Sequence, residues 1–317
     1  MKKQAIAILI LITFTLGCVS EDIEVVNEFV NEIEQQTSEE SHIFEPTTIE
    51  ETTDTEESIS DNTLRVGAFN IQVFGVTKAD KPEVMDVIAD IVRTYDIVAI
   101  QEIRDSSQTA LPELVDLVNS DGPNYQYVVS ERLGRTTSKE QYAYIYNSNT
   151  VEVIGDPQTY PEPENTDPFH RQPYIASFKS ISGNYDAVLM VIHTDPDEAT
   201  EEINALDDVL AYSQSIYPDE QDFIIMGDIN ADGSYFDEDS TSDIDEYYWV
   251  IDDSQDTTVA SSDNTYDRII LTDSSDLSGQ SGVFRYDLEY NLTEDLTSDV
   301  SDHYPVYAEF SINSDND

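Results

Sequence analysis

Basic residues and cysteine are both scarce in this sequence. The 317 residues include 14 Lys and Arg against 67 Asp and Glu, which gives a formal net charge of -53, and there is one cysteine. So few positive charges exclude the basic surface by which proteins usually bind nucleic acid through charge alone. A single cysteine excludes an internal disulfide, so the fold must be stable without a covalent link.

The acidic excess does not exclude a folded core. Hydrophobic residues make up 39% of the chain, and its 317 residues suffice for one large domain or two small ones. Many carboxylates with little Lys are typical of a protein adapted to concentrated salt, where charge repulsion is screened within roughly 3 Å at about 1 M ionic strength. We therefore expect a halophilic globular protein.

The N-terminal segment MKKQAIAILILITFTLG, residues 1–17, combines two lysines with a short apolar run. This pattern is typical of a secretion signal peptide, because the run is too short to span a membrane. Cys18 follows where a lipoprotein signal is cut and its cysteine lipidated; the alternative is an incidental cysteine in a discarded signal. The sequence thus predicts an exported protein, extracellular or anchored to the outer face of the cell membrane.

Residues 18–62 are dominated by Glu, Thr and Ser, and no Lys or Arg occurs between Lys3 and Arg65. Such a segment buries too little apolar surface to order itself. We expect a disordered acidic linker in which only 24–36 has the apolar spacing of a short helix.

From residue 63 the pattern changes to strands and amphipathic helices. Apolar spacing predicts helices over 81–95, 109–120 and 197–217. Strands are predicted over 64–74, 96–103, 125–131, 141–147, 150–155, 174–180, 186–194, 223–230, 265–271, 282–286 and 304–312. Strands dominate this region, and no domain boundary is apparent after residue 63. The simplest architecture is therefore one α/β domain over 63–313, with two packed sheets covered by helices, and a tail at 314–317.

Polar residues stand at the ends of six predicted strands. They are Asn70, Glu102, His193, Asp228 with Asn230, Asp267, and Asp302 with His303. One buried carboxylate such as Glu102 is often a paired structural group, since burial without a partner or metal is costly. Six such strand ends make a structural explanation for all of them improbable.

Half of the basic residues outside the N-terminal segment lie in or beside these strands. They are Arg104, Arg132, Arg135, Lys139, Arg171 and Arg268. The planar fork of arginine suits a phosphate, and carboxylates with Asn suit a hard divalent cation. Together with two histidines they indicate metal-assisted phosphodiester hydrolysis. The absence of G-x-x-x-x-G-K-[ST] and G-x-S-x-G argues against a P-loop NTPase and a serine hydrolase.

Eight segments, in order, resemble the deoxyribonuclease I family within the endonuclease/exonuclease/phosphatase superfamily, over residues 64–310. They are AFNIQVFG, YDIVAIQEIRD, YVVSERLGRTTSKEQYAYIY, PFHRQP, VIHTDPDEATEEINAL, IMGDINADGSY, TYDRIIL and VSDHYPV. The second, sixth and last mark the superfamily, whereas YVVSERLGR…KEQYAYIY and TYDRI look specific to the nuclease branch. The resemblance implies a four-layer sandwich of two mainly antiparallel β-sheets flanked by helices.

The resemblance also implies the roles of the site residues. It makes His193 and His303 an acid–base pair, polarised by Glu140 and Asp267, because a carboxylate behind an imidazole fixes its tautomer and raises its basicity. The remaining implied roles are Mg²⁺ or Mn²⁺ binding by Asn70, Glu102 and Asp302, positioning of phosphate and water by Asp228 and Asn230, and phosphate or DNA contacts by Arg171, Arg104 and Arg135.

The chain departs from the family pattern at several positions. Ser138 replaces a tyrosine that packs into the minor groove, and Gln72 replaces an arginine; both changes should weaken the grip on DNA. The family's disulfide positions hold Gly233 and Asn264. The calcium loops survive in part: Asp167 is present in one, beside Gln172 in place of a carboxylate, and Asp256 and Thr258 remain in the other.

These observations predict a monomeric, metal-dependent endonuclease that cuts mainly double-stranded DNA and leaves 5′-phosphate ends, with Ca²⁺ as a candidate second ion. Since a charge of -53 repels DNA at low salt, we expect activity to rise with salt. The alternatives are a phosphodiesterase of the same superfamily acting on phospholipids or small phosphate esters, and a non-enzymatic binding protein.

Overall fold

The computed structural model describes residues 62–237, 240–313 and 315. The predicted signal peptide, the lipidation site Cys18, the helix at 24–36, nearly all of the linker and most of the tail lie outside this part of the chain. Within it, no helix is long and apolar enough to cross a membrane.

The first sheet has six strands in the order β11-β12-β1-β2-β4-β3. Their bounds are β1 (Thr63–Phe74), β2 (Ile97–Ile103), β3 (Tyr125–Val129), β4 (Gln141–Asn147), β11 (Leu277–Val283) and β12 (Val306–Ser311). β1 and β2 are parallel, and the other pairs are antiparallel.

The second sheet also has six strands, in the order β5-β6-β7-β8-β10-β9. Their bounds are β5 (Val151–Thr159), β6 (Tyr174–Ser180), β7 (Asp186–Val191), β8 (Phe223–Asp228), β9 (Tyr248–Trp249) and β10 (Asp267–Leu271). Only β7 and β8 pair in parallel, so both sheets are mixed and mainly antiparallel.

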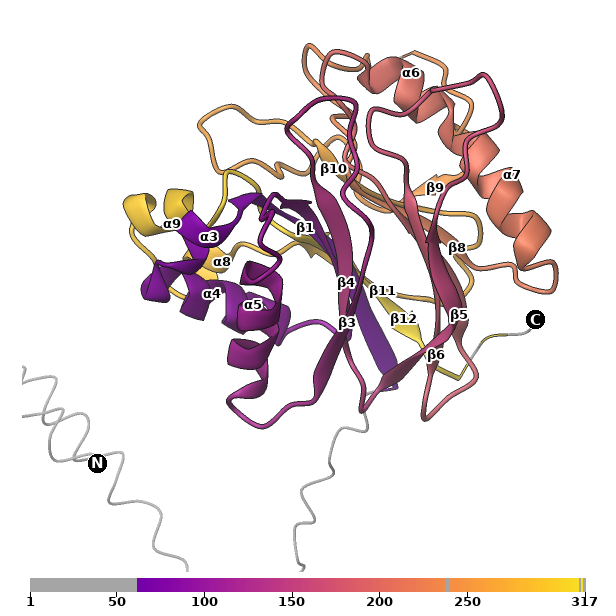
Figure 1. Ribbon diagram of the computed structural model, residues 1–317. Coiled ribbons are helices and arrows are strands. Elements are labelled where there is room, and N and C mark those ends of the chain that lie inside the picture. Colours follow the sequence, from indigo (N-terminus) through magenta and orange to yellow (C-terminus); the bar gives the residue numbers. More distant parts are fainter. Residues whose placement is uncertain (1–61, 238–239, 314, 316–317) are drawn as a thin grey trace, which may run out of the picture. The chain divides into compact units, whose positions relative to one another are not determined.

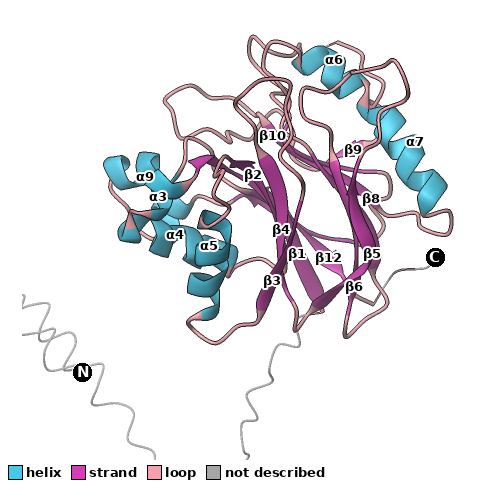
Figure 2. Ribbon diagram, in the orientation of Figure 1, coloured by secondary structure: helices cyan, strands magenta, loops and turns pink. Residues whose placement is uncertain are grey.

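Helices cover the outer face of each sheet (Figures 1 and 2). On the side of the first sheet lie α3 (Val76–Ala79), α4 (Pro82–Val92), α5 (Ala110–Asn119), α8 (Tyr286–Glu289) and α9 (Glu294–Val300). On the side of the second lie α6 (Ala199–Asn204) and α7 (Leu206–Ile216). One apolar core separates the two sheets, and one fills each helix–sheet interface. The expected four-layer sandwich is confirmed.

Three element predictions were wrong in detail. The helix expected over 197–217 is two helices, because the N–H of Ala205 is shared between the carbonyls of Glu201 and Glu202 and the chain turns there. The strand expected over 282–286 ends at Val283, and Tyr286 begins α8 with its ring fully buried. The short elements α3, β9, α8 and α9 were missed because so few residues carry no clear periodicity.

Irregular backbone occurs where strands reach the edge that holds the site. The pairing of β1 with β2 shifts register between Asn70 and Phe74, and both Val73 (φ 52°) and Glu102 (φ 59°) adopt left-handed conformations. A β-branched residue with positive φ is strained, and such strain persists at sites that the surrounding structure fixes. At Gly227 (φ 131°) an added Cβ would lie 2.1 Å from the Ile192 carbonyl oxygen, so glycine is required for β8 to approach β7.

Candidate active site

The strand-end residues predicted from the sequence meet at one edge of the two sheets. β8 ends at Asp228 and β10 begins at Asp267, and these two residues are register partners in the antiparallel pair. His193 follows β7 by two residues, and His303 precedes β12 by three. Glu140 precedes β4 and is held by a bridge to Leu133. Different strands therefore deliver both histidines and their predicted carboxylate partners to the same place.

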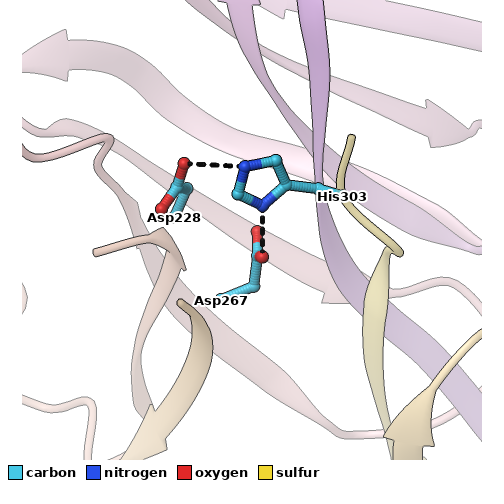
Figure 3. Close-up of side chains that lie close together, drawn as sticks. All are labelled: Asp228, Asp267 and His303. Carbon is cyan, nitrogen blue, oxygen red and sulfur yellow. Dashed lines mark hydrogen bonds and ion pairs between the residues drawn. The ribbon is translucent and has the colours of Figure 1, made fainter. Parts of the chain in front are cut away.

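His303 lies between two carboxylates (Figure 3). Its Nδ1 is 2.7 Å from Oδ2 of Asp267, and its Nε2 is 3.5 Å from Oδ2 of Asp228. Burial disfavours the charged imidazolium, but the charges of Asp267 and Asp228 outweigh burial and raise the pKa of His303. The raised pKa favours the protonated imidazole of His303, whose Nδ1 faces Asp267 and whose Nε2 faces Asp228.

His193 forms the second imidazole–carboxylate pair. Its Nδ1 is 3.0 Å from Oε2 of Glu140, and its Nε2 is 3.5 Å from the same Asp228 oxygen, Oδ2. Burial and the positive charge of Arg171 lower the pKa of His193, whereas Glu140 and Asp228 raise it, and the net direction is upward. Glu140 remains ionised despite its burial, because His193, Arg171 and Arg104 lower its pKa to about 2.

Asp228 connects the two pairs. Besides facing both histidines, its Oδ2 accepts a hydrogen bond of 2.9 Å from Nδ2 of Asn70. Burial raises the pKa of Asp228, but the two histidines and the Asn70 bond outweigh burial and lower it. Asn230 lies beside it with positive φ (50°) and donates from Nδ2 to the carbonyl and hydroxyl oxygens of Thr194, both at 3.2 Å. The amide of Asn230 is therefore oriented by the loop that follows His193.

Oxygen atoms suited to a hard cation gather beside this centre. Asn70 is 1% exposed, and its Oδ1 has no hydrogen-bond partner. Its Nδ2 lies 3.4 Å from Oε1 of Glu102, whose Oε2 accepts from the Val73 N–H at 2.7 Å. A buried amide oxygen without a partner next to a carboxylate is the donor set that Mg²⁺ or Mn²⁺ takes. These residues fit the metal that the sequence predicts.

Asp302 is placed less tightly than the other two predicted ligands. Its side chain is 52% exposed, and its Oδ2 accepts a hydrogen bond of 2.8 Å from Nε2 of Gln72. Both Asp302 and Glu102 act electrostatically on the buried ammonium of Lys78, whose pKa burial lowers to about 8. The two carboxylates therefore lie on the same side of the site as Lys78, a residue that the sequence analysis did not identify.

The arginines are largely occupied by the protein itself. Arg171 is buried and donates to the carbonyls of His193 and Thr194, both at 2.9 Å. Arg104 bridges Glu102 (3.0 Å) and Glu140 (2.9 Å), so it joins a predicted metal ligand to the His193 pair.

The other basic residues near the site support loops. Arg135 pairs with Asp167 and Glu198. Arg132, Lys139 and Arg268 donate to backbone carbonyls. Their retention in an acidic chain is therefore explained by loop structure as well as by any phosphate contact.

The candidate calcium residues are occupied by local contacts. Asp167 pairs with Arg135, while Oδ1 of Asp256 accepts from the backbone and hydroxyl of Thr258 at 2.9 and 2.8 Å. Gly233 and Asn264, which occupy the family's disulfide positions, do lie together, since a Cβ on Gly233 would be 3.0 Å from Oδ1 of Asn264. A hydrogen bond of 2.6 Å from the Thr265 N–H to Asp232 joins the two loops instead.

Two buried residues that the sequence analysis missed hold the loops of the site. Oε1 of Glu202 accepts from the backbone N–H groups of His170 (3.2 Å) and Asp195 (3.1 Å), so it fixes the loops that carry Arg171 and His193. Ser301 donates to the Asn70 carbonyl at 2.6 Å and accepts from the His303 N–H at 3.1 Å. The two residues hold opposite sides of the site.

Two imidazole–carboxylate pairs beside a set of oxygen ligands, at the edge of a two-sheet sandwich, define a hydrolytic enzyme of the phosphoester-cleaving class. A model of the endonuclease/exonuclease/phosphatase family matches residues 67–303, and the chain belongs to this family. Within it, the chain is a deoxyribonuclease I-like member, as the curated relatives show.

Deoxyribonuclease-1 of Bos taurus is 39% identical over 257 residues, which cover 77% of this chain and 90% of that protein. Deoxyribonuclease gamma of Mus musculus is 37% identical over 266 residues, covering 79% and 85%. Among solved structures, the human Nocturnin catalytic domain aligns with a TM-score of 0.56 at 16% identity, covering 79% of this chain and 94% of that one. ANGEL2, a 2′,3′-cyclic phosphatase, aligns with a TM-score of 0.55 at 14% identity, covering 78% and 95%. At such identities these structures show the fold alone.

Proposed function

We propose that this protein is a divalent-metal-dependent endonuclease that hydrolyses phosphodiester bonds of double-stranded DNA. The observation that carries the proposal is the convergence of two histidines on one carboxylate, with each Nε2 3.5 Å from Oδ2 of Asp228. Curated relatives named as deoxyribonucleases cover most of the domain, which favours DNA over a phospholipid or a small phosphate ester.

The two histidines supply the proton transfers of the reaction. One neutral imidazole takes a proton from water as the water oxygen bonds to phosphorus, and one imidazolium gives a proton to O3′ as the P–O3′ bond breaks. The products are a 5′-phosphate end and a 3′-hydroxyl. Glu140 and Asp267 orient the rings through Nδ1, so that each Nε2 faces the reacting groups.

Asn70, Glu102 and Asp302 would hold Mg²⁺ or Mn²⁺. The ion would supply charge stabilisation at the phosphoryl oxygens. Asp228 raises the pKa of both imidazoles and, with Asn230, orients the phosphate and water. Arg104 and Arg171 keep Glu140 ionised. Arg135 lies between β3 and β4 and pairs with Asp167 and with Glu198, which is on the segment that follows His193.

The charge of the protein sets the salt dependence that we propose. With a formal net charge of -53 the protein repels DNA at long range, and screening at high salt removes that repulsion. Activity therefore rises with ionic strength, opposite to the usual fall that counterion release produces. We further propose export, anchoring through a lipid on Cys18, and a monomeric state.

The test is nicking of supercoiled plasmid with Mg²⁺ or EDTA, from low to molar NaCl, beside a phosphatidylcholine vesicle and a small phosphodiester. The matched variants are Glu102→Gln at the metal site and Asp86→Asn on the exposed face of α4. We expect Mg²⁺-dependent nicking that rises with salt and is lost in Glu102→Gln but kept in Asp86→Asn. Cleavage of the vesicle lipid or the small ester without nicking of DNA would overturn the proposed substrate, and nicking that peaks at low salt would overturn the salt proposal alone.

A further inference from the structure

Three buried carboxylates gather at the end of the sandwich opposite the candidate active site. Asp222 precedes β8, whose other end carries Asp228, while Asp276 precedes β11 and Asp315 follows β12. Carboxylate oxygens of all three lie within 4.8 Å of one another, and the residues are 5%, 4% and 7% exposed. We call these three residues the far-end cluster. It joins a strand of the second sheet to two strands of the first.

The protein orients the oxygens of the far-end cluster. Oδ2 of Asp315 accepts the backbone N–H of Asp186 at 3.1 Å, and Oδ2 of Asp276 lies 3.4 Å from the Ser275 hydroxyl. Asp222 is two residues before Ile224, which packs in the core between the sheets, so its side chain points to that same face. Three buried carboxylates this close offer oxygen ligands from three separate segments of the chain, which is the kind of ligand set that a hard divalent cation takes.

Tyr185 provides an independent sign of a ligand at this cluster. The residue is 3% exposed, its hydroxyl has no hydrogen-bond partner, and its ring stacks on Phe310 at 5.3 Å between centroids. Tyr185 precedes Asp186, whose N–H binds Asp315, and Phe310 is the register partner of Leu277, the residue after Asp276. Tyr185 therefore lies beside the far-end cluster, where a bound cation or its water would give its hydroxyl the missing partner.

We propose that Asp222, Asp276 and Asp315 bind a calcium ion, with the Tyr185 hydroxyl at the edge of the site. Oxygen ligands from separate segments suit Ca²⁺, which accepts irregular geometry, better than Mg²⁺, which requires a near-ideal octahedron. The ion clamps the two sheets at the end remote from the histidines. Its effect is on stability, and the site is independent of the proposed nuclease activity.

The test measures the number of bound Ca²⁺ ions by equilibrium dialysis, together with the thermal unfolding midpoint with and without Ca²⁺. It compares the wild-type protein with the variant Asp222→Asn/Asp276→Asn. The matched control is Asp86→Asn/Asp116→Asn, which changes two carboxylates exposed on α4 and α5. We expect the far-end variant to bind one Ca²⁺ fewer than the wild type and to lose the rise in midpoint, while the control keeps both. The same stoichiometry and the same rise in wild type and far-end variant would overturn the proposal.

Tyr185→Phe keeps the ring that packs on Phe310 and removes only the hydroxyl, so it gives a second test if the double variant does not fold. In Tyr185→Phe we expect the far-end cluster to bind Ca²⁺ with several-fold lower affinity, while the thermal unfolding midpoint of the Ca²⁺-free protein stays unchanged. Unchanged Ca²⁺ affinity in this variant would contradict the place of Tyr185 at the edge of the site.

Discussion

The two histidine centres share one geometry but differ in the charges around them. On the His193 side, Arg104 lies 2.9 Å and Arg171 3.6 Å from Glu140, so positive charge offsets the carboxylate behind the imidazole. On the His303 side, the only ion pair of Asp267 within the described part of the chain is the one to His303 at 2.7 Å. His303 therefore faces almost unopposed negative charge.

This difference assigns unequal roles within the proposed reaction. The pKa values of both histidines are raised, but that of His303 more strongly, because Asp267, Asp228 and Asp302 all favour its proton. His193 loses its proton first as pH rises and is the better candidate for the base. His303 is the better candidate for the acid. Arginine placement around one dyad thus separates the tasks of two chemically identical groups.

Removal of the shared carboxylate should have the largest effect. Asp228→Asn removes the charge that lies 3.5 Å from each Nε2, so we expect the pKa of both histidines to fall and plasmid nicking to slow about 10³-fold, within the range for lost acid–base function. Nicking rates and histidine NMR titrations measure the two effects. A fall in the pKa of one histidine only would break the symmetry assumed for Asp228.

The dyad partners test the comparison directly. We expect Asp267→Asn to lower the pKa of His303 more than Glu140→Gln lowers that of His193, because Asp267 lies closer to its imidazole, at 2.7 Å against 3.0 Å. Histidine ring titrations by NMR on the metal-free protein give both values. Equal decreases would show that the two carboxylates act equally on their imidazoles.

The pH dependence of stability follows from His303. Its pKa is raised above the unfolded value of about 6.5, so its stabilising contribution is complete below that pH and is lost as pH rises into the alkaline range. Urea unfolding of the metal-free protein should show a larger decrease from neutral to alkaline pH for the wild type than for Asp267→Asn. Parallel curves for the two proteins would contradict the assignment.

Glu202 adds a titrating group on the His193 side. Burial raises its pKa from 4.5 to about 7, against the N–H bonds from Asp195 and His170 and the charge of Arg171, while Glu198 raises it further. The neutral form therefore contributes stability below pH 4.5 that is lost as pH rises through about 7. Glu202→Gln keeps an acceptor oxygen, so we expect less than a tenfold loss of nicking and a flatter stability profile over this window. A profile as steep as that of the wild type would exclude Glu202 as its source.

Ser301 is the corresponding support on the His303 side and should give the smallest effect. Ser301→Ala removes the bonds to the Asn70 carbonyl and the His303 N–H, which should cost about 1–3 kcal/mol of unfolding free energy. We expect the pKa of His303 to change little, because no charge is lost. A large change in that pKa would mean that Ser301 acts on the imidazole and not only on the loop.

The sequence predicted the residues whose chemistry is distinctive and missed those whose context is not. His193, Glu102 and Asp228 stand out because each ends an apolar run, and their strands bring them together as expected. Glu202 lies in an acidic helix beside Glu198 and Glu201, and only burial distinguishes it from them.

Tertiary contacts also decide what the basic residues do. Arg171 and Arg268 have the residue type expected for phosphate binding, yet both are buried against backbone carbonyls that no local pattern places there. Lys78 is buried beside Val300, to whose carbonyl it donates at 2.7 Å, although 222 residues separate them. Periodicity predicted the layers of the fold because each strand and helix carries its own apolar face, whereas these polar contacts join distant segments.

The most direct test of the central claim is the nicking rate of supercoiled plasmid by His193→Ala, His303→Ala and the double variant, with Mg²⁺ at high salt. If the histidines act as one acid–base unit, each single variant should lose about 10²–10⁴-fold in rate. The double variant should be little worse than either single variant, since residues that act as a unit are not additive. Near-wild-type nicking by either single variant, with its fold intact, would contradict the account.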